Sequence, residues 1–119
     1  MISLLNIALN FIYLTHYDKS KFVFTNNLGK KIRIEREKQN LLLRQVAAFL
    51  EIDTALISKV ERGERRLSRL HVVKLAQLLK ASEEELISLW LCDKIIEVID
   101  EDSYAIQAMK KAINQIKEN

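Results

Sequence analysis

The sequence predicts an all-helical protein. The chain has 119 residues, of which 49% are hydrophobic, and it contains no proline and only two glycines. Alternating runs of β-branched and polar residues, which are typical of half-buried strands, are scarce. Apolar residues recur instead at spacings of three and four, as they do on one face of a helix. A chain of this length can bury one core and a dimer interface, but not two large domains.

The N-terminal segment 1–24 leaves three interpretations open. Its first part, 1–14, is strongly apolar, but it has neither a basic n-region nor a small-residue cleavage site, which disfavours a secretory signal. Fourteen residues are also too few to span a bilayer, for which about 20 are needed. The alternatives are a packed or dimer-capping helix, a flexible leader or an over-extended start site, and membrane attachment.

The first helix of the folded part is expected at about 28–39, where Leu28 and Ile32 share one face. Two shorter helices follow, at 43–50 and 54–62, separated by a break of three residues. Their apolar faces are formed by Val46, Ala47, Leu50, Ile57 and Val60.

The connection between these two short helices is the most informative feature of the chain. Asp53 stands where an N-cap should, and its carboxylate can accept hydrogen bonds from the free amides of the next turn. Ala47 is small where the helices would cross, and Gly63 is placed to end the second helix. Two helices joined by so short a turn form a helix-turn-helix, whose second helix enters the DNA major groove.

The next helix is expected to begin after Ser68, a suitable N-cap. The residues expected to face inward on it are Leu70, Val73, Ala76 and either Leu78 or Leu79. Ser82, with Glu85 three residues later, forms a capping box that opens a longer helix through Ile99. The acidic run 100–103 breaks this helix, and a last one follows with an apolar face of Ala105, Met109, Ala112 and Ile116.

These elements divide the chain into three expected parts: the apolar leader 1–24, a helix-turn-helix domain at 25–81 and a C-terminal helical extension at 82–119. The apolar surface between 86 and 116 exceeds what a small domain needs, which favours a homodimer interface. Trp90 fits that interface and the core equally well.

Charge is segregated along the chain. Residues 25–80 contain 13 Lys and Arg against 6 Asp and Glu, a net charge of +7. Residues 81–119 contain 4 against 9, a net charge of −5. Either the charges simply solvate helix faces, or only the basic part meets a polyanion; together with the helix-turn-helix, the second interpretation is favoured.

The run Ile57-Ser58-Lys59-Val60-Glu61-Arg62-Gly63, together with Arg36 and Val46-Ala47, resembles the signature of the Xre/Cro/C1 family of phage and bacterial repressors. The resemblance covers about 28–86. It implies a lambda-repressor-like five-helix DNA-binding domain, here with extra C-terminal helices for dimerisation.

Three residues depart from the family pattern. Leu42 stands where a polar cap is usual, and Leu43 where a glutamine usually contacts phosphate. Glu51 replaces the usual glycine of the turn, a position that favours positive φ. The phosphate contact at the start of the first short helix is therefore not expected here.

The resemblance also assigns roles to individual residues. Thr and Ser hydroxyls, small apolar groups and a lysine can all read base edges in the major groove. The base-contact candidates are Thr54, Ala55, Leu56, Ser58 and Lys59. Basic residues that meet phosphates supply affinity and position. The phosphate-contact candidates are Lys30, Arg44, Arg62, Arg65, Arg66 and Arg69. The alternative for each of these residues is an ordinary solvated surface position.

In the resemblance, Arg36 pairs with Glu61, the residue that ends the recognition helix. The functional interpretation is a half-buried ion pair that fixes this helix against the first one. The alternative is a screened surface pair that contributes about 0–1 kcal/mol.

Other classes of protein are disfavoured. The sequence shows no nucleophile–base pair, glycine-rich phosphate loop or carboxylate pair, so neither an enzyme nor a cofactor is expected. His16 and His71 are isolated, which disfavours a metal site. The single cysteine, Cys92, excludes an intrachain disulfide and fits a reducing compartment such as the cytoplasm.

The sequence thus indicates a bacterial, cytoplasmic regulator of transcription that binds double-stranded DNA as a homodimer. Of the possible modes of action, repression is favoured. Two alternatives stay open. One is an antitoxin or other partner-binding protein whose acidic C-terminal helices hold another protein. The other is a restriction-modification controller protein, which is similar in size and fold.

Overall fold

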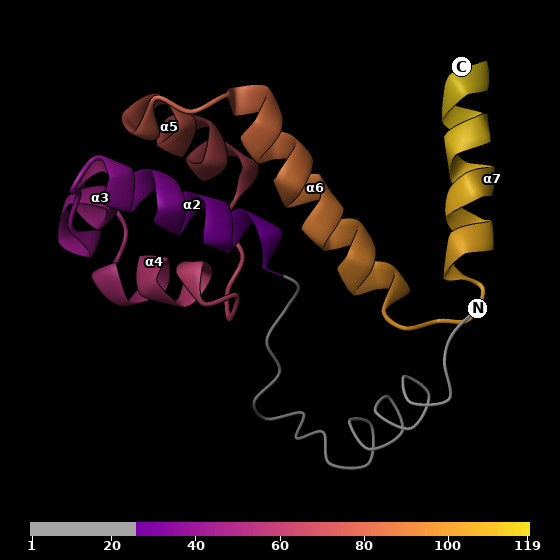
Figure 1. Ribbon diagram of the computed structural model, residues 1–119, viewed down its shortest axis with the longest axis horizontal. Helices are drawn as coiled ribbons and strands as arrows, with labels where there is room; N and C mark the ends of the chain where they lie inside the picture. Colours follow the sequence, from indigo (N-terminus) through magenta and orange to yellow (C-terminus); the bar gives the residue numbers. More distant parts are fainter. Residues whose placement is uncertain (1–25) are drawn as a thin grey trace, which may run out of the picture.

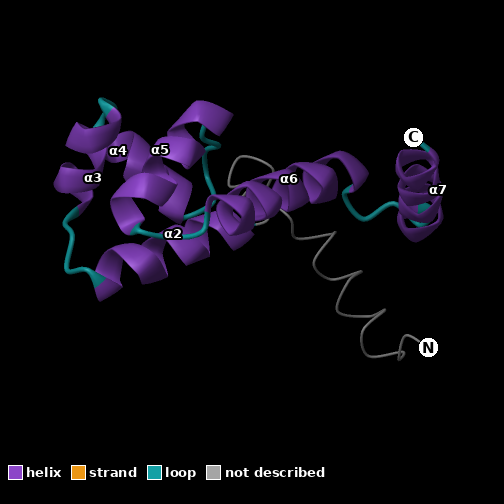
Figure 2. Ribbon diagram, turned by 90° about the horizontal axis from the view of Figure 1, so that it is seen from above, coloured by secondary structure: helices purple, strands orange, loops and turns teal. Residues whose placement is uncertain are grey.

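The computed structural model describes residues 26–119. This part of the chain is entirely helical, with no strand, which confirms the predicted fold class (Figures 1 and 2). The leader 1–24 lies outside the described residues. The helices are α2 (Asn27–Lys38), α3 (Leu43–Leu50), α4 (Thr54–Glu61), α5 (Arg69–Leu79), α6 (Glu83–Ile99) and α7 (Ala105–Glu118).

The predicted helix boundaries are correct to within one residue for α2, α3 and α4. Local signals explain this agreement. The Asp53 side chain accepts a hydrogen bond from the Ala55 amide at 3.2 Å, as an N-cap does. Gly63 ends α4 with φ = 78° and donates to the Val60 carbonyl at 3.1 Å. At the start of α5, Ser68 likewise accepts from the His71 amide at 3.2 Å.

One hydrophobic core holds α2 to α5 and the first half of α6 together. In this five-helix body, α2 contacts α4, α5 and α6, while α3 contacts α4 and α5. All five helices contribute to the largest side chains that are fully enclosed, which are Ile32, Leu50, Ile57, Leu75, Leu79 and Leu86. Burying such a side chain stabilises the fold by about 1.5–3 kcal/mol relative to leaving it in water. The core residues of α3 and α4 predicted from their spacing are all buried.

The prediction for Leu70 on α5 is wrong. Its side chain is 62% exposed, and the buried residues of α5 are Val72, Leu75, Ala76 and Leu79. A helix makes a turn every 3.6 residues, so a spacing of exactly three residues drifts around it. Over the nine residues from Leu70 to Leu79 the drift reaches half a turn, which places the two leucines on opposite sides.

The helix α6 begins in the core and leaves it. Ser82 caps its first turn by accepting from the Glu85 amide at 3.1 Å, whereas the Glu85 carboxylate pairs with Lys31 of α2 at 3.3 Å. Trp90 belongs to the core: it is buried, and its indole N–H donates to the Leu67 carbonyl at 2.8 Å. The expected boundary at 81/82 therefore falls inside the body that α2–α6 build, because Leu86 and Trp90 complete its core.

The last helix, α7, stands apart from this body. Figure 1 shows α6 and α7 as the two arms of an open V, joined by 100–104. No residue of α7 is buried, although Ile106, Ile113 and Ile116 are large and apolar. Between the arms lies a groove of about 530 Å³, lined mainly by Leu91, Ile95, Val98, Met109, Ile113 and Ile116.

Candidate nucleic-acid interface

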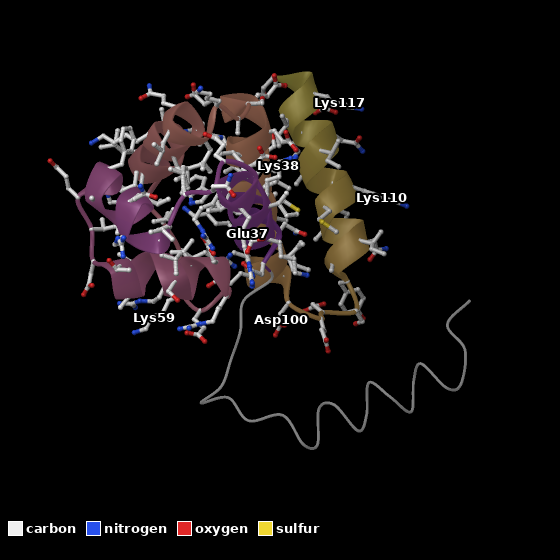
Figure 3. All side chains as sticks on the ribbon, turned by 60° about the vertical axis from the view of Figure 1, so that its left-hand side comes forward. Glu37, Lys38, Lys59, Asp100, Lys110 and Lys117 are labelled. Atoms are coloured by element: carbon white, nitrogen blue, oxygen red, sulfur yellow. The ribbon has the colours of Figure 1, made fainter. Side chains whose placement is uncertain are left out.

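The second helix of the helix-turn-helix, α4, has one buried and one exposed face. Ile57 and Val60 anchor it in the core. Thr54, Ala55 and Lys59 are exposed, and Figure 3 shows Lys59 pointing outward from α4, away from the body. A free face beside a buried anchor is what a helix needs to enter a groove of DNA.

The other two base-contact candidates are less accessible. Ser58 is half-buried. Leu56 is half-buried as well and packs against the hydrophobic core. The structure therefore does not bring Leu56 to the same free face as Lys59, and the spacing of the family motif gave no sign of this.

Five of the six phosphate-contact candidates have exposed side chains: Lys30, Arg44, Arg62, Arg65 and Arg69. Arg62 pairs with Glu64 at 3.1 Å, and because both side chains are largely exposed this contact adds little stability. Arg62 and Arg65 lie between α4 and α5, and Arg69 is the first residue of α5. Their exposure is compatible with phosphate contacts from this part of the chain.

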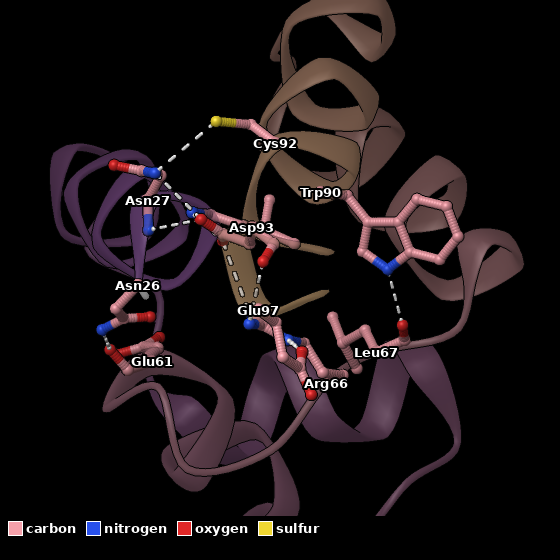
Figure 4. A network of polar contacts seen from close by, with 10 residues as sticks. Asn26, Asn27, Glu61, Arg66, Leu67, Trp90, Cys92, Asp93 and Glu97 are labelled. Atoms are coloured by element: carbon pink, nitrogen blue, oxygen red, sulfur yellow. Dashed lines mark hydrogen bonds and ion pairs between the residues drawn. The ribbon is translucent and has the colours of Figure 1, made fainter. Parts of the chain in front are cut away.

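Arg66 is the exception among these arginines. Its side chain is only 21% exposed, and its guanidinium lies against α6, with Nη1 3.5 Å from Asp93 Oδ2 and Nε 3.1 Å from Glu97 Oε2 (Figure 4). The sequence gave no indication of these partners. Arg66 is thus directed toward the protein, unlike its exposed neighbour Arg65.

The predicted pair of Arg36 and Glu61 is present and half-buried. Arg36 Nε donates to Glu61 Oε2 at 2.7 Å, and Nη2 donates to Oε1 at 3.0 Å. The two side chains are 13% and 6% exposed. The third nitrogen, Nη1, donates to the Leu41 carbonyl at 2.8 Å. The hydrogen bonding of Arg36 to the Glu61 carboxylate, which accepts from it, raises the pKa of Arg36 above its ordinary value more than any other contact does.

The start of α2 lies directly against the end of α4. The Asn26 side-chain amide donates to the Glu61 carbonyl at 2.7 Å. Gly29 sits so close that a β-carbon there would collide with the Val60 carbonyl oxygen. The C-terminal end of α4 is therefore held by both side-chain and backbone contacts with the N-terminal end of α2.

The three departures from the family pattern have distinct structural outcomes. Leu42 offers no side-chain cap, but its amide donates to Gln45 Oε1 at 2.7 Å, so one free donor is satisfied from within α3. Leu43 packs partly against the core. Glu51 adopts a left-handed conformation, with φ = 57°, in the place where glycine would be unstrained.

Sequence reasoning missed Asp93, a carboxylate that is 1% exposed. It accepts from the Asn27 amide at 3.2 Å, from the Asn27 side chain at 2.9 Å and from the Leu28 amide at 3.0 Å (Figure 4). It thereby caps α2 from another helix. A signal was present, since Asp93 continues the apolar stripe of Leu86 and Trp90 at helical spacing.

Within residues 26–119, no group of three or more His, Cys, Asp or Glu side chains could hold a metal ion. In the same part of the chain, no helix has the length and hydropathy that crossing a membrane requires.

The chain is similar to a helix-turn-helix family model and to two solved structures. A protein-family model described as helix-turn-helix matches residues 32–86. The chain is similar to the restriction-modification controller protein C.AhdI from Aeromonas hydrophila, with 30% identity, coverage of 51% of this chain and 92% of that chain, and a TM-score of 0.48. It is also similar to the clp gene regulator ClgR from Corynebacterium glutamicum, with 22% identity, coverage of 78% and 88%, and a TM-score of 0.50. The second likeness concerns the fold alone. No curated protein matches the chain.

Proposed function

Residues 32–86 belong to the Xre/Cro/C1-type helix-turn-helix family, and from this premise we propose that the protein is a sequence-specific regulator of transcription that binds duplex DNA as a homodimer. The observation that carries the proposal is the free face of α4, with Thr54, Ala55 and Lys59 exposed on a helix whose other face is anchored in the core.

In this proposal α4 lies in the major groove. Lys59 reaches guanine O6 and N7, Thr54 and Ser58 donate to or accept from base edges, and Ala55 packs near a thymine methyl group. Leu56 contributes little to the contact with thymine methyl groups, because its side chain packs partly against the core.

The exposed basic residues Lys30, Arg44, Arg62, Arg65 and Arg69 supply the phosphate contacts in this proposal. Such contacts give affinity that depends on salt and fix the register of the protein on DNA. They fit the net charge of +7 over 25–80 and the net charge of −5 over the rest of the chain to 119, which would keep the C-terminal part away from phosphate.

Dimerisation is proposed through the groove between α6 and α7. One recognition helix per chain reads a single half-site, so two copies are needed for an operator of ordinary length. The groove is apolar, and α7 buries none of its large side chains within the described chain. A second copy that inserts its own α6 and α7 would cover both surfaces at once, as an isologous interface does.

We further propose repression as the mode of action, because a protein that occupies the major groove of a promoter competes with polymerase and needs no other surface. Such a regulator acts in the cytoplasm and carries out no catalytic step. The acidic C-terminal part and the same groove also suit an unrelated protein partner, as in an antitoxin, so the test below includes this outcome.

Selection of duplexes from a randomised DNA pool by the full chain tests the proposal. We expect enrichment of a site with two-fold symmetry, with half-sites about one helical turn apart. Sedimentation of the free protein should show a dimer at micromolar concentration. A chain that enriches no duplex contradicts the DNA-binding proposal, and a monomer that assembles only with another protein contradicts the homodimer.

A further inference from the structure

The loop after the recognition helix is tied to α6 through Arg66, Asp93 and Glu97, which we call the Arg66 junction. We propose that Arg66 is a positioning residue for DNA binding: it holds this loop against α6, so that its neighbours meet the phosphates, and makes no phosphate contact itself. The proposal rests on the proposed function and deepens it, since it concerns the same DNA-binding surface.

The geometry of the junction is specific. Arg66 lies five residues beyond the end of α4 and three before the start of α5. It faces two carboxylates, with Nη1 3.5 Å from Asp93 and Nε 3.1 Å from Glu97, one turn apart on α6. Its Nη2 also approaches the Asp93 carbonyl oxygen at 3.4 Å. All three nitrogen atoms of the guanidinium thus contact oxygen atoms of α6 (Figure 4).

Electrostatics explains why Arg66 stays there. Asp93 is almost fully buried, and a buried carboxylate is costly unless it is both hydrogen-bonded and paired with a positive charge. The amides of Asn27 and Leu28 supply the hydrogen bonds, but the positive charge comes from Arg66. A phosphate that drew Arg66 away would leave the Asp93 charge without this compensation.

The junction also belongs to a set of contacts that surround the C-terminal end of α4. Asp93 caps the start of α2, and Asn26, at that same start, donates to the Glu61 carbonyl at the end of α4. On the other side, Arg66 holds the chain that leaves α4. The end of α4 is therefore fixed both from α2 and from α6, and Arg62 and Arg65 are carried on the short stretch between these two points.

The direction in which Glu97→Gln changes the affinity for DNA distinguishes a positioning role of Arg66 from a purely electrostatic effect. Replacing an acidic residue by a neutral one reduces repulsion from DNA and so should raise affinity. In Glu97→Gln, however, the contact with Arg66 loses its ionic part, and the loop loses part of its support. If Arg66 acts by positioning, Glu97→Gln lowers the affinity instead, by about threefold to fivefold, as expected for a half-exposed ion pair.

The experiment compares the parent, Glu97→Gln and the control Glu101→Gln, which removes the same charge just beyond α6 without touching the junction. The probe is a duplex that the parent selects from a randomised pool, with binding measured by fluorescence anisotropy. We expect Glu101→Gln to bind as tightly as the parent or more tightly. Glu97→Gln binding as tightly as Glu101→Gln would overturn the proposal.

The variant Arg66→Lys gives a second, independent readout. Lysine keeps the positive charge and can still contact a phosphate, but it lacks the planar group that faces Asp93 and Glu97 together. If Arg66 contacted phosphate, Arg66→Lys would bind about as tightly as the parent, whereas loss of positioning lowers the affinity by about threefold to fivefold, as in Glu97→Gln. An affinity equal to that of the parent would overturn the proposal. A parent that selects no duplex would overturn the proposed function together with this inference, whereas normal selection by the parent confines any failure to the role of Arg66.

Discussion

Arg36 of α2 holds Glu61, the last residue of α4, by two parallel hydrogen bonds of 2.7 and 3.0 Å. The planar guanidinium fits a carboxylate in this way in one orientation only, so the pair fixes the rotation of α4 as well as its distance from α2. The pair therefore decides which residues of α4 are exposed, and in the proposed function this is how it would influence DNA binding without contacting DNA.

The first prediction concerns this pair. Glu61→Ala leaves the Arg36 charge half-buried and unpaired, and removing one partner of a buried pair typically costs about 3–5 kcal/mol. We expect the free energy of unfolding to fall by about this amount in urea titrations, with loss of DNA binding. A Glu61→Ala protein that unfolds at the same urea concentration as the parent would show that the pair is only a surface contact.

The second prediction separates base contacts from phosphate contacts. Lys59→Ala should lose discrimination at one base pair, on the order of 1–3 kcal/mol, while its binding to random DNA changes little. Arg65→Ala should weaken binding to selected and random duplexes alike and flatten the salt slope by about one unit. Equal losses on both duplexes for Lys59→Ala would remove Lys59 from the base-reading residues.

The third prediction concerns the groove between α6 and α7. Ile113→Glu places a carboxylate in the proposed dimer interface, where burying an unpaired charge costs several kcal/mol, so the dimer dissociation constant should rise about a hundredfold or more. Lys110→Glu is the control: it changes the charge of α7 even more, but Lys110 projects from the outer side of the helix (Figure 3). Sedimentation equilibrium measures both. If the two variants dissociate alike, the interface lies elsewhere.

The fourth prediction concerns Glu51, which has φ = 57° between α3 and α4. A left-handed conformation costs a residue with a β-carbon roughly 1–2 kcal/mol, and glycine avoids this cost at the expense of some chain entropy. Glu51→Gly should therefore stabilise the protein by up to about 1 kcal/mol in thermal unfolding. Ala48→Gly, inside α3, should destabilise it by about the same amount. If both variants shifted the free energy of unfolding in the same direction, the left-handed conformation of Glu51 would not be the cause of the effect.

Local signals made much of the fold predictable. Asp53 and Ser68 cap helices through amides two and three residues away, so the sequence nearby contains both partners. Arg36 and Glu61 lie 25 residues apart, and their pairing was predicted only from the family resemblance. The assignments of individual residues to bases and phosphates stay predictions.

Long-range partners could not be predicted. Asp93 meets Leu28 across 65 residues and Arg66 across 27, and no spacing rule connects such positions. For this reason Arg66 was grouped with the exposed arginines, although a buried carboxylate holds it. On α5 the prediction was correct for Ala76 and Leu79 and wrong for Leu70, which nine residues of helix place half a turn away from Leu79.

If α7 is stabilised only by a second copy of the chain, its folding depends on the concentration of the protein. A helix of 14 residues with no buried side chain is close to the limit of stability in water. If a second copy covers its apolar face, helix formation and association are one equilibrium, and the helix content must rise with protein concentration. A cell that makes little of this chain would then hold partly unfolded single copies, and one that makes more would hold ordered pairs, so the amount synthesised would itself set the threshold for occupying an operator.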